Sequence, residues 1–164
     1  MIAAMLDLLP GPLHRLALRA AHALRLFWWR TTRRTVRGTT VIAADARGRV
    51  LLVRHSYHAS HVWMLPGGGL GRGESAIEAA SRELAEETGC TLSGPSHIGT
   101  VTLDRRGWTN LLDVIAGRTD DTPRADGREI VEARFFDPLS LPESTSASVR
   151  AMIADWRDQN GSSA

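Results

Sequence analysis

Apolar residues recur with a helical period in the first part of the chain and with a strand period after it. Between residues 12 and 30 they return every three or four positions, which predicts an amphipathic helix. From Thr35 the pattern changes to short runs of β-branched residues and leucine, separated by turns that contain Gly, Asp or Pro. We therefore expect an N-terminal helical extension over residues 1–34 and one domain over residues 35–164.

Strands and helices interleave in this predicted domain. A helix over residues 75–88 has clear ends, because Ser75 and Glu78 have the spacing of a capping box and Gly89 suits the left-handed position after a helix. A loop over residues 56–72 precedes it. The other expected elements are strands at 39–44, 49–55, 97–104, 109–117 and 129–136, and a closing helix at 144–158. This order predicts an α/β domain whose helices pack on a mixed sheet.

Basic residues are concentrated near the N-terminus. All 20 basic residues of the chain are arginine, and the segment 12–34 is rich in them and contains no acidic residue. A helix of this kind could pack on the domain or on a second subunit, lie on an anionic membrane surface, or act as a targeting presequence. A homodimer and a peripheral membrane contact through residues 12–34 therefore both stay open.

The rest of the composition is typical of a globular protein. The single cysteine, Cys90, suits a reducing compartment and favours a cytoplasmic location. No apolar run reaches the roughly 18 residues that a membrane-spanning helix needs. The sequence contains neither an internal repeat nor a DNA-binding motif.

Glutamates crowd on the helix predicted over residues 75–88. Glu83, Glu86 and Glu87 are close neighbours there, and like charges four residues apart destabilise a helix by a few tenths of a kcal/mol. At about 100° per residue these three glutamates share one stripe with the small side chains of Ala76 and Ala79. The stripe expected to be buried contains Ile77, Ala80, Leu84 and Thr88.

The glutamate stripe is predicted to face a ligand. Glu78 and Arg82 are four residues apart in the favourable order, so we expect them to pair with each other and to leave the stripe without a basic residue. Clustered carboxylates that face open space are typical of a site for Mg²⁺, which takes oxygen ligands and is usually shared with substrate phosphates. The glycines at 67–69 let the backbone come close to such a ligand.

The segment from Gly68 to Cys90 resembles the Nudix box of the Nudix hydrolases. The pattern of that family is G-x5-E-x7-R-E-U-x-E-E-x-G-U, where U is a bulky aliphatic residue, and every fixed position is matched here except that Cys90 takes the last aliphatic position. The preceding "VWMLPGGG" is similar to the family's W-x-L-P-G-G. The resemblance covers residues 35–142, and residues 1–34 lie outside it.

This resemblance implies an α/β/α sandwich, the Nudix fold. It also implies that Mg²⁺ or Mn²⁺ supports hydrolysis of a nucleoside diphosphate linked to another group, X. By position, the implied metal ligands are Glu83, Glu86, Glu87, Glu129 and the carbonyl of Gly67, with Glu83 or Glu86 as the catalytic base. Arg54, Gly68 and Gly69 are expected to contact the substrate, whereas Glu74, Arg82 and Gly89 are expected to hold the motif together.

Three functions are compatible with a Nudix box. A pyrophosphohydrolase fits best, because all the glutamates of the box are present. A nucleotide-sensing module without turnover would be expected to lack some of them. An isomerase of the related isoprenoid-diphosphate type would need an active-site cysteine, and Cys90 occupies a packing position. The marks of the subfamilies for ADP-ribose, diadenosine polyphosphates and coenzyme A are missing, so the group X is not identified.

Histidine and tryptophan give weaker signals. His55, His58 and His61 recur every third residue, but no cysteine or carboxylate accompanies them. We therefore interpret them as solvent-exposed or substrate-rim residues and not as a zinc site. Trp63 and Trp108 could stack on a base, but core packing or a place in a surface patch is the favoured interpretation for each.

Overall fold

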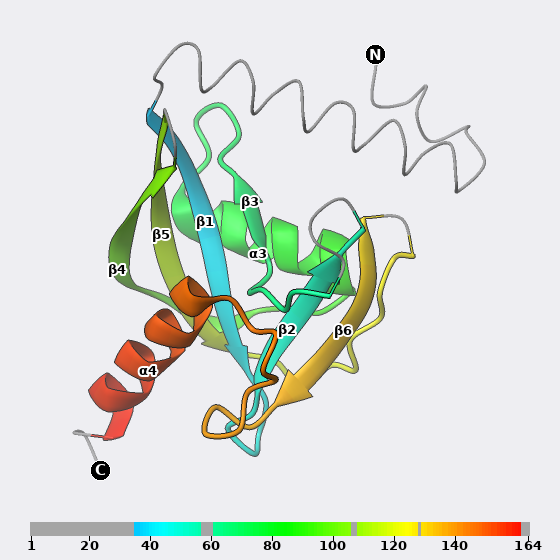
Figure 1. Ribbon diagram of the computed structural model, residues 1–164. Helices are drawn as coiled ribbons and strands as arrows, with labels where there is room; N and C mark the ends of the chain where they lie inside the picture. The colour runs from blue at the N-terminus through cyan, green and yellow to red at the C-terminus, as the bar shows by residue number, and fades with distance from the viewer. Residues whose placement is uncertain (1–34, 57–60, 106–107, 128, 162–164) are drawn as a thin grey trace.

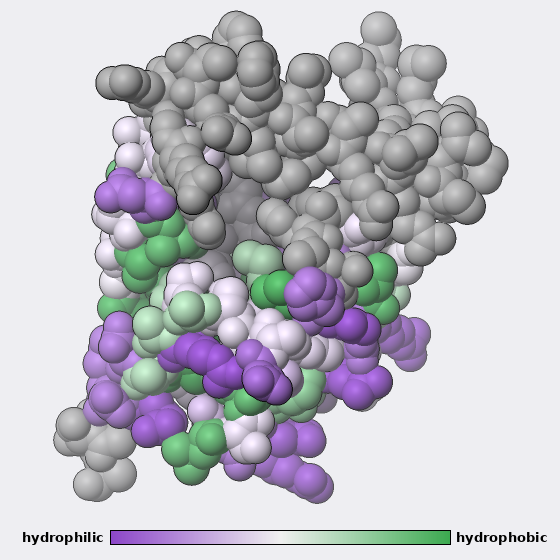
Figure 2. Space-filling view, viewed as in Figure 1, coloured by the Kyte–Doolittle hydropathy of each residue, from purple (hydrophilic) through white to green (hydrophobic). Residues whose placement is uncertain are grey.

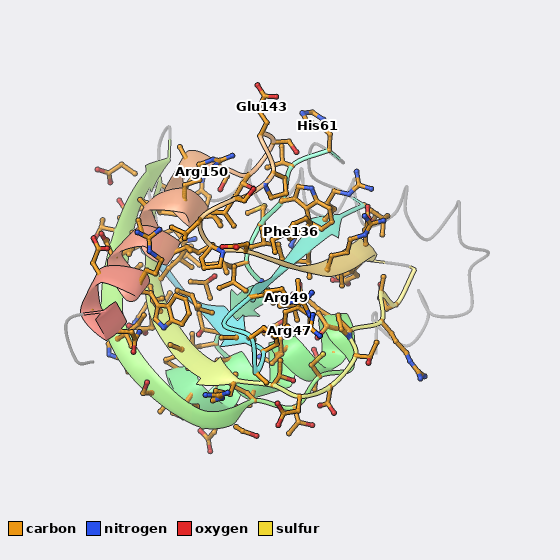
Figure 3. The ribbon with its side chains drawn as sticks, turned by 90° about the horizontal axis from the view of Figure 1, so that it is seen from below. Arg47, Arg49, His61, Phe136, Glu143 and Arg150 are labelled. Carbon is orange, nitrogen blue, oxygen red and sulfur yellow. The ribbon has the colours of Figure 1, made fainter. Side chains whose placement is uncertain are left out.

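The computed structural model describes residues 35–56, 61–105, 108–127 and 129–161 (Figure 1). The elements in chain order are β1 (Thr35–Ala44), β2 (Val50–His55), β3 (Gly67–Gly69), α3 (Ala76–Thr88), β4 (Ser93–Arg105), β5 (Trp108–Arg118), β6 (Ile130–Phe136) and α4 (Ala147–Gly161). The two helices lie on opposite sides of the sheet, as the view from below in Figure 3 shows. The helix predicted over residues 12–30 and the segment 1–34 lie outside the described residues.

The sheet is mixed and splits into two arms. Its strand order is β4-β5-β1-β2-β6, with β3 paired to β1. β1 and β5 are parallel, and the other paired strands are antiparallel. β1 and β2 pair at Ala44 and Val50, beside the turn that joins them, and then diverge (Figure 1). β3 takes the place beside β1 that β2 leaves, with Gly68 opposite Thr39.

The segment before β3 bridges the two diverging arms. Met64 exchanges backbone hydrogen bonds with Val53 of β2, at N–O distances of 2.8 and 2.9 Å. Two residues later, the carbonyl of Pro66 accepts from the N–H of Val41 in β1 at 2.9 Å. The segment is therefore attached to both arms, and it delivers the glycines of β3 to β1.

Side chains of the central strands alternate between two cores. In β1, Val41 and Ala43 face α3, while Ile42 between them faces α4, as the two-residue period of a strand requires. The core on the α3 side contains Val41, Ala43, Leu51, Ala80, Leu84, Cys90, Leu92 and Ile115. The core on the α4 side contains Ile42, Val50, Leu52, Trp63, Leu65, Val114, Ala116, Val149, Met152 and Ile153. The expected α/β/α sandwich is thus confirmed, as are the packing roles of Cys90 and Trp63.

The structure differs from the predicted elements in several places. β1 begins at Thr35, four residues before its predicted start, and α4 is Ala147–Gly161 instead of residues 144–158. β3 lies inside the predicted loop. The prediction missed this strand because glycine is depleted in strands, so a run of glycines does not indicate one. β4 begins at Ser93, four residues before the predicted start at His97. Ile77 is 37% exposed instead of buried. The buried stripe passes through Ala76, Ala80 and Leu84, and Ile77 lies about 100° away from Ala76 around the helix.

The surface of the described residues carries few large apolar side chains. Apolar and polar residues alternate over the face in Figure 2. The exposed large hydrophobic residues in the described part of the chain are Ile77, Val131 and Leu139. Among the same residues, no helix is both long enough and apolar enough to cross a membrane.

Leu84 should be a main support of the packing of α3. Its side chain is fully buried, so Leu84→Ala removes apolar contacts and leaves a cavity. We expect a loss of about 2–5 kcal/mol in the free energy of unfolding, measured by urea denaturation. Ile77→Ala on the same helix is the control, with an expected loss of about 1 kcal/mol or less. Equal losses for the two variants would contradict this packing of α3.

Candidate functional site

The ends of α3 are fixed as its sequence predicts. Ser75 Oγ accepts from the backbone N–H of Glu78 at 3.2 Å, and Glu78 Oε2 accepts from the backbone N–H of Ser75 at 2.9 Å. At the other end Gly89 is left-handed, with φ 70°, and its N–H donates to the carbonyl of Ala85. With both ends capped and one side buried, the helix presents Glu83 and Glu87 to β3.

Glu87 is a buried carboxylate among other carboxylates. Its residue is 6% exposed, and its Oε2 accepts from the backbone N–H of Gly67 at 3.2 Å. Burial raises the pKa of Glu87 well above its usual range, and the negative charges of Glu83, Glu129 and Asp126 add to this rise. A cation between these groups would relieve both the burial and the repulsion.

Glu83 lies directly against the backbone of β3. A Cβ atom on Gly68 would come within 2.3 Å of Glu83 Oε1, so only glycine leaves room for this carboxylate. Burial raises the pKa of Glu83, although the hydrogen bond and the positive charge of Arg82 act in the opposite direction. Gly67 is constrained for a different reason, because its Cβ would collide with the carbonyl oxygen of Thr39 at 2.2 Å.

Arg82 ties the loop before α3 to the helix. Its Nε and Nη2 donate to the two oxygens of Glu74 at 2.8 and 2.9 Å, and Nη2 also donates to the carbonyl of Gly69 at 3.1 Å. Glu74 in turn accepts from the N–H of Gly71 at 2.6 Å. These contacts connect both ends of the loop that follows β3.

The predicted pairing of Arg82 is wrong in two respects. Glu78 does not pair with it, because the capping box occupies the Glu78 carboxylate. Nη1 of Arg82 instead donates to Glu83 at 2.8 Å and to Glu86 at 3.3 Å. The stripe of glutamates therefore has a basic neighbour, which partly offsets its charge. The side chain of Glu86 is 60% exposed and lies at the open side of the cluster.

Two further residues lie beside the glutamates of α3. The backbone carbonyl of Glu129 accepts from the N–H of Ser56 at 2.8 Å, and the charge of Glu129 is close enough to raise the pKa of Glu87. His55 is buried, at 5% exposure, with Nδ1 3.8 Å from Oε1 of Glu87. The interpretation of His55 as solvent-exposed or at the substrate rim is therefore wrong, whereas His61 is exposed as expected and His58 lies outside the described residues.

Arg54 is already engaged by neighbouring side chains. Its guanidinium pairs with Glu132 of β6 and lies over the ring of Trp63, 5.2 Å from the centroid. This arrangement holds the cationic group at the end of β2, one residue before His55. Its expected contact with substrate stays a prediction.

The donor set suits a hard divalent cation. In the described residues, no three side chains of Asp, Glu, His or Cys are gathered in a way that would hold an ion on their own. Mg²⁺ usually keeps several waters and uses only one or two carboxylates together with substrate phosphates. A buried Glu87, whose pKa is raised by burial and also by neighbouring carboxylates, and a half-buried Glu83 provide that kind of incomplete ligand set.

A hollow lies away from the glutamate cluster, beside the turn that follows β1. It has a volume of about 330 Å³ and includes the turn with Arg47 and Arg49, both labelled in Figure 3. Arg49 is held there by Asp45, whose Oδ2 accepts from Nε at 2.7 Å, and its guanidinium lies 5.6 Å from the centroid of Phe135. Arg49 and Asp45 therefore neutralise each other in this hollow, and the glutamate cluster is the stronger candidate for the functional site.

Comparisons with known proteins identify the family and the fold of this chain. The family model of the NUDIX domain matches residues 34–156. A "Putative 8-oxo-dGTP diphosphatase" of Bacillus subtilis is 31% identical over 122 residues, which are 74% of this chain and 79% of the relative. An "RNA pyrophosphohydrolase" of Shewanella oneidensis is 40% identical over 121 residues, 71% of this chain but only 65% of the relative. The fold is similar to the MutT protein from Methanosarcina mazei, with a TM-score of 0.68, 24% identity and coverage of 78% and 96% of the two chains.

The Arg82–Glu74 pair should contribute to stability in a pH-dependent manner. Hydrogen bonds from Arg82 and Gly71 lower the pKa of Glu74 from 4.5 to about 2. A lowered pKa stabilises the fold above the unfolded-state value, and this contribution is lost as the pH falls from about 4.5 through about 2. We expect Glu74→Gln to lower the free energy of unfolding at pH 7 and the difference from wild type to shrink at pH 3, measured by urea denaturation. A difference that does not depend on pH would contradict this role.

Proposed function

Because this chain belongs to the Nudix hydrolase family, we propose that it is a pyrophosphohydrolase that uses a divalent metal ion. Its substrate would be a nucleoside diphosphate linked to a group X, and water would attack a phosphorus atom of the anhydride. The observation that carries the proposal is the buried Glu87, surrounded by carboxylates and in contact with the backbone of β3. The ionised form of such a group is costly to bury unless a cation accompanies it.

The proposed ligands of Mg²⁺ or Mn²⁺ are oxygen atoms from three segments. α3 supplies Glu83, Glu86 and Glu87, β3 supplies the carbonyl of Gly67, and the segment before β6 supplies Glu129. Bound there, the metal ion would neutralise phosphate charge and polarise the anhydride.

The proton of the attacking water needs an acceptor. Glu83 and Glu86 are the candidates, and both already accept a hydrogen bond from Arg82. Arg82 thereby fixes the direction of each carboxylate, and Glu74 on the opposite side of the guanidinium fixes Arg82. A base oriented in this way can take a proton without first losing side-chain freedom.

We propose a nucleotide-type substrate with at least one phosphoanhydride bond. Support comes from the names of the relatives, which describe action on an oxidised nucleoside triphosphate and on RNA. Gly68 and Gly69 would bring backbone groups to the phosphates, and Arg54 would supply a guanidinium at the end of β2. From the sequence alone we also propose a cytoplasmic location, a homodimer and a peripheral membrane contact through residues 12–34.

Gly68→Ala should damage the metal site but not the fold. The new methyl group meets the end of the Glu83 side chain and not backbone, so the side chain can rotate away from Arg82 while β3 keeps its place. We expect the urea midpoint to stay close to that of wild type while Mn²⁺ affinity and phosphate release both fall by at least about tenfold. The double variant with Glu83→Gln should be little worse than Glu83→Gln alone, because both changes act on one carboxylate. Additive losses would contradict this explanation.

Removal of a buried site glutamate should abolish turnover. Glu83→Gln and Glu87→Gln keep the shape of the side chain but remove its negative charge. We expect phosphate release in the presence of Mg²⁺ to fall by a factor of at least about 100, measured on a panel that includes oxidised nucleoside triphosphates, nucleotide sugars and RNA with a 5′-triphosphate. Glu78→Gln on the same helix is the control, since Glu78 belongs to the capping box, and its kcat should stay close to wild type. Unchanged turnover in the Glu83 and Glu87 variants would overturn the proposed mechanism.

A further inference from the structure

His55 and Gly67 of β3 approach different oxygens of the Glu87 carboxylate. The two residues are the most buried ionisable neighbours at the site, with side chains 5% and 6% exposed. Nδ1 of His55 is 3.8 Å from Oε1 of Glu87, while Oε2 of the same carboxylate accepts from the N–H of Gly67. One oxygen is thus oriented by β3 and the other faces the imidazole.

The position of His55 is set by the sheet and not by a mobile loop. His55 is the last residue of β2 and pairs with Ile130 of β6. Arg54, one residue earlier, pairs with Glu132, so β6 has one extra residue, Val131, at this point. Bulges of this kind are frequent next to active sites, where they re-aim neighbouring groups.

The same bulge connects His55 to another proposed ligand. Because β6 has gained a residue, the carbonyl of Glu129 comes opposite Ser56 and accepts from its N–H at 2.8 Å. The end of β2 therefore sets the positions of His55 and of the Glu129 backbone together. Both approach Glu87 from the β2–β6 arm of the sheet, whereas Gly67 approaches it from the β1 arm.

We propose that His55 is a positioning residue for Glu87. Its Nδ1–H would hold one carboxylate oxygen so that the carboxylate keeps a fixed direction toward the metal ion. The distance of 3.8 Å is longer than a hydrogen bond, so the proposed role requires one of the two side chains to move closer when the metal ion binds. A neutral imidazole with its proton on Nδ1 is sufficient for this role. The inference rests on the proposed function, since it takes Glu87 as a metal ligand.

Positioning predicts a definite order of metal affinities. Outer partners of metal-binding carboxylates typically contribute a factor of about 10–100 in metal affinity. His55→Leu keeps apolar bulk but removes the donor, whereas His55→Asn keeps an N–H group near the place of Nδ1. A residue that only fills space would show the opposite preference, because leucine suits a buried position better than asparagine.

The test is a titration of the full chain with Mn²⁺ alone, followed by the electron paramagnetic resonance signal of free Mn²⁺. We expect His55→Leu to weaken Mn²⁺ binding by about 10–100-fold, His55→Asn to weaken it by no more than about threefold, and His61→Leu, at an exposed histidine, to have no effect. Urea denaturation of each variant shows that the fold is kept. If His55→Leu binds Mn²⁺ as wild type does, or if His55→Asn is as weak as His55→Leu, the inference is overturned.

Two further measurements separate this inference from its alternatives. Glu87→Gln in the same titration tests the proposed metal site itself. If Glu87→Gln binds Mn²⁺ normally, the metal site of the proposed function is refuted. If Glu87→Gln loses Mn²⁺ binding while His55→Leu binds normally, only the role of His55 is refuted.

Pulsed electron paramagnetic resonance of bound Mn²⁺ should show no directly coordinated nitrogen. A nitrogen signal that disappears in His55→Leu would make His55 a ligand and would also overturn the positioning role.

Discussion

The ion pair between Arg82 and Glu74 is the interaction on which the site depends most. It is bidentate, and the same guanidinium reaches the carbonyl of Gly69 and the carboxylate of Glu83. One cation therefore connects the end of β3, the loop after it and the middle of α3. If this connection were lost, the glycines would still pair with β1, but nothing in the loop would hold α3 at the distance where Glu83 touches Gly68. The spacing of Glu74 and Arg82 in the sequence therefore helps to set the distance between β3 and α3.

Much of this arrangement could be predicted from the sequence because it is local. The capping box, the left-handed Gly89 and the burial of Leu84 each depend on residues within a few positions of one another, where helical geometry alone decides the outcome. The helical angle also placed Glu83, Glu86 and Glu87 together. It could not decide the partner of Arg82, because the capping box takes up the Glu78 carboxylate and the approach of Glu74 depends on the path of the loop. Ile77 was misplaced because the angular origin of the buried stripe is set by the sheet.

The remaining parts of the site come from segments far apart in the chain. Nothing in the local pattern indicates that His55 is buried beside Glu87, since 32 positions separate them and a histidine at a strand end is usually solvated. Asp126 gave no signal either, because it belongs to a polar loop in which acidic residues are common. Its carboxylate accepts from the N–H groups of Glu129 and Ile130, and this shapes the approach to β6. Such contacts depend on which strands become neighbours, and only the folded sheet supplies that information.

Because the sheet is split, the two sides of the candidate site belong to different arms of the sheet. β1 and β2 pair at Ala44 and Val50 and then separate, so the two arms of the sheet are joined near this pair. Gly67 and Gly68 belong to the β1 arm. His55 and the backbone of Glu129 belong to the β2–β6 arm. The Glu87 carboxylate is approached from both arms. Any change in the angle between the two arms would therefore change the distance across the candidate site. Residues 64–66 are hydrogen-bonded to both arms and would resist such a change.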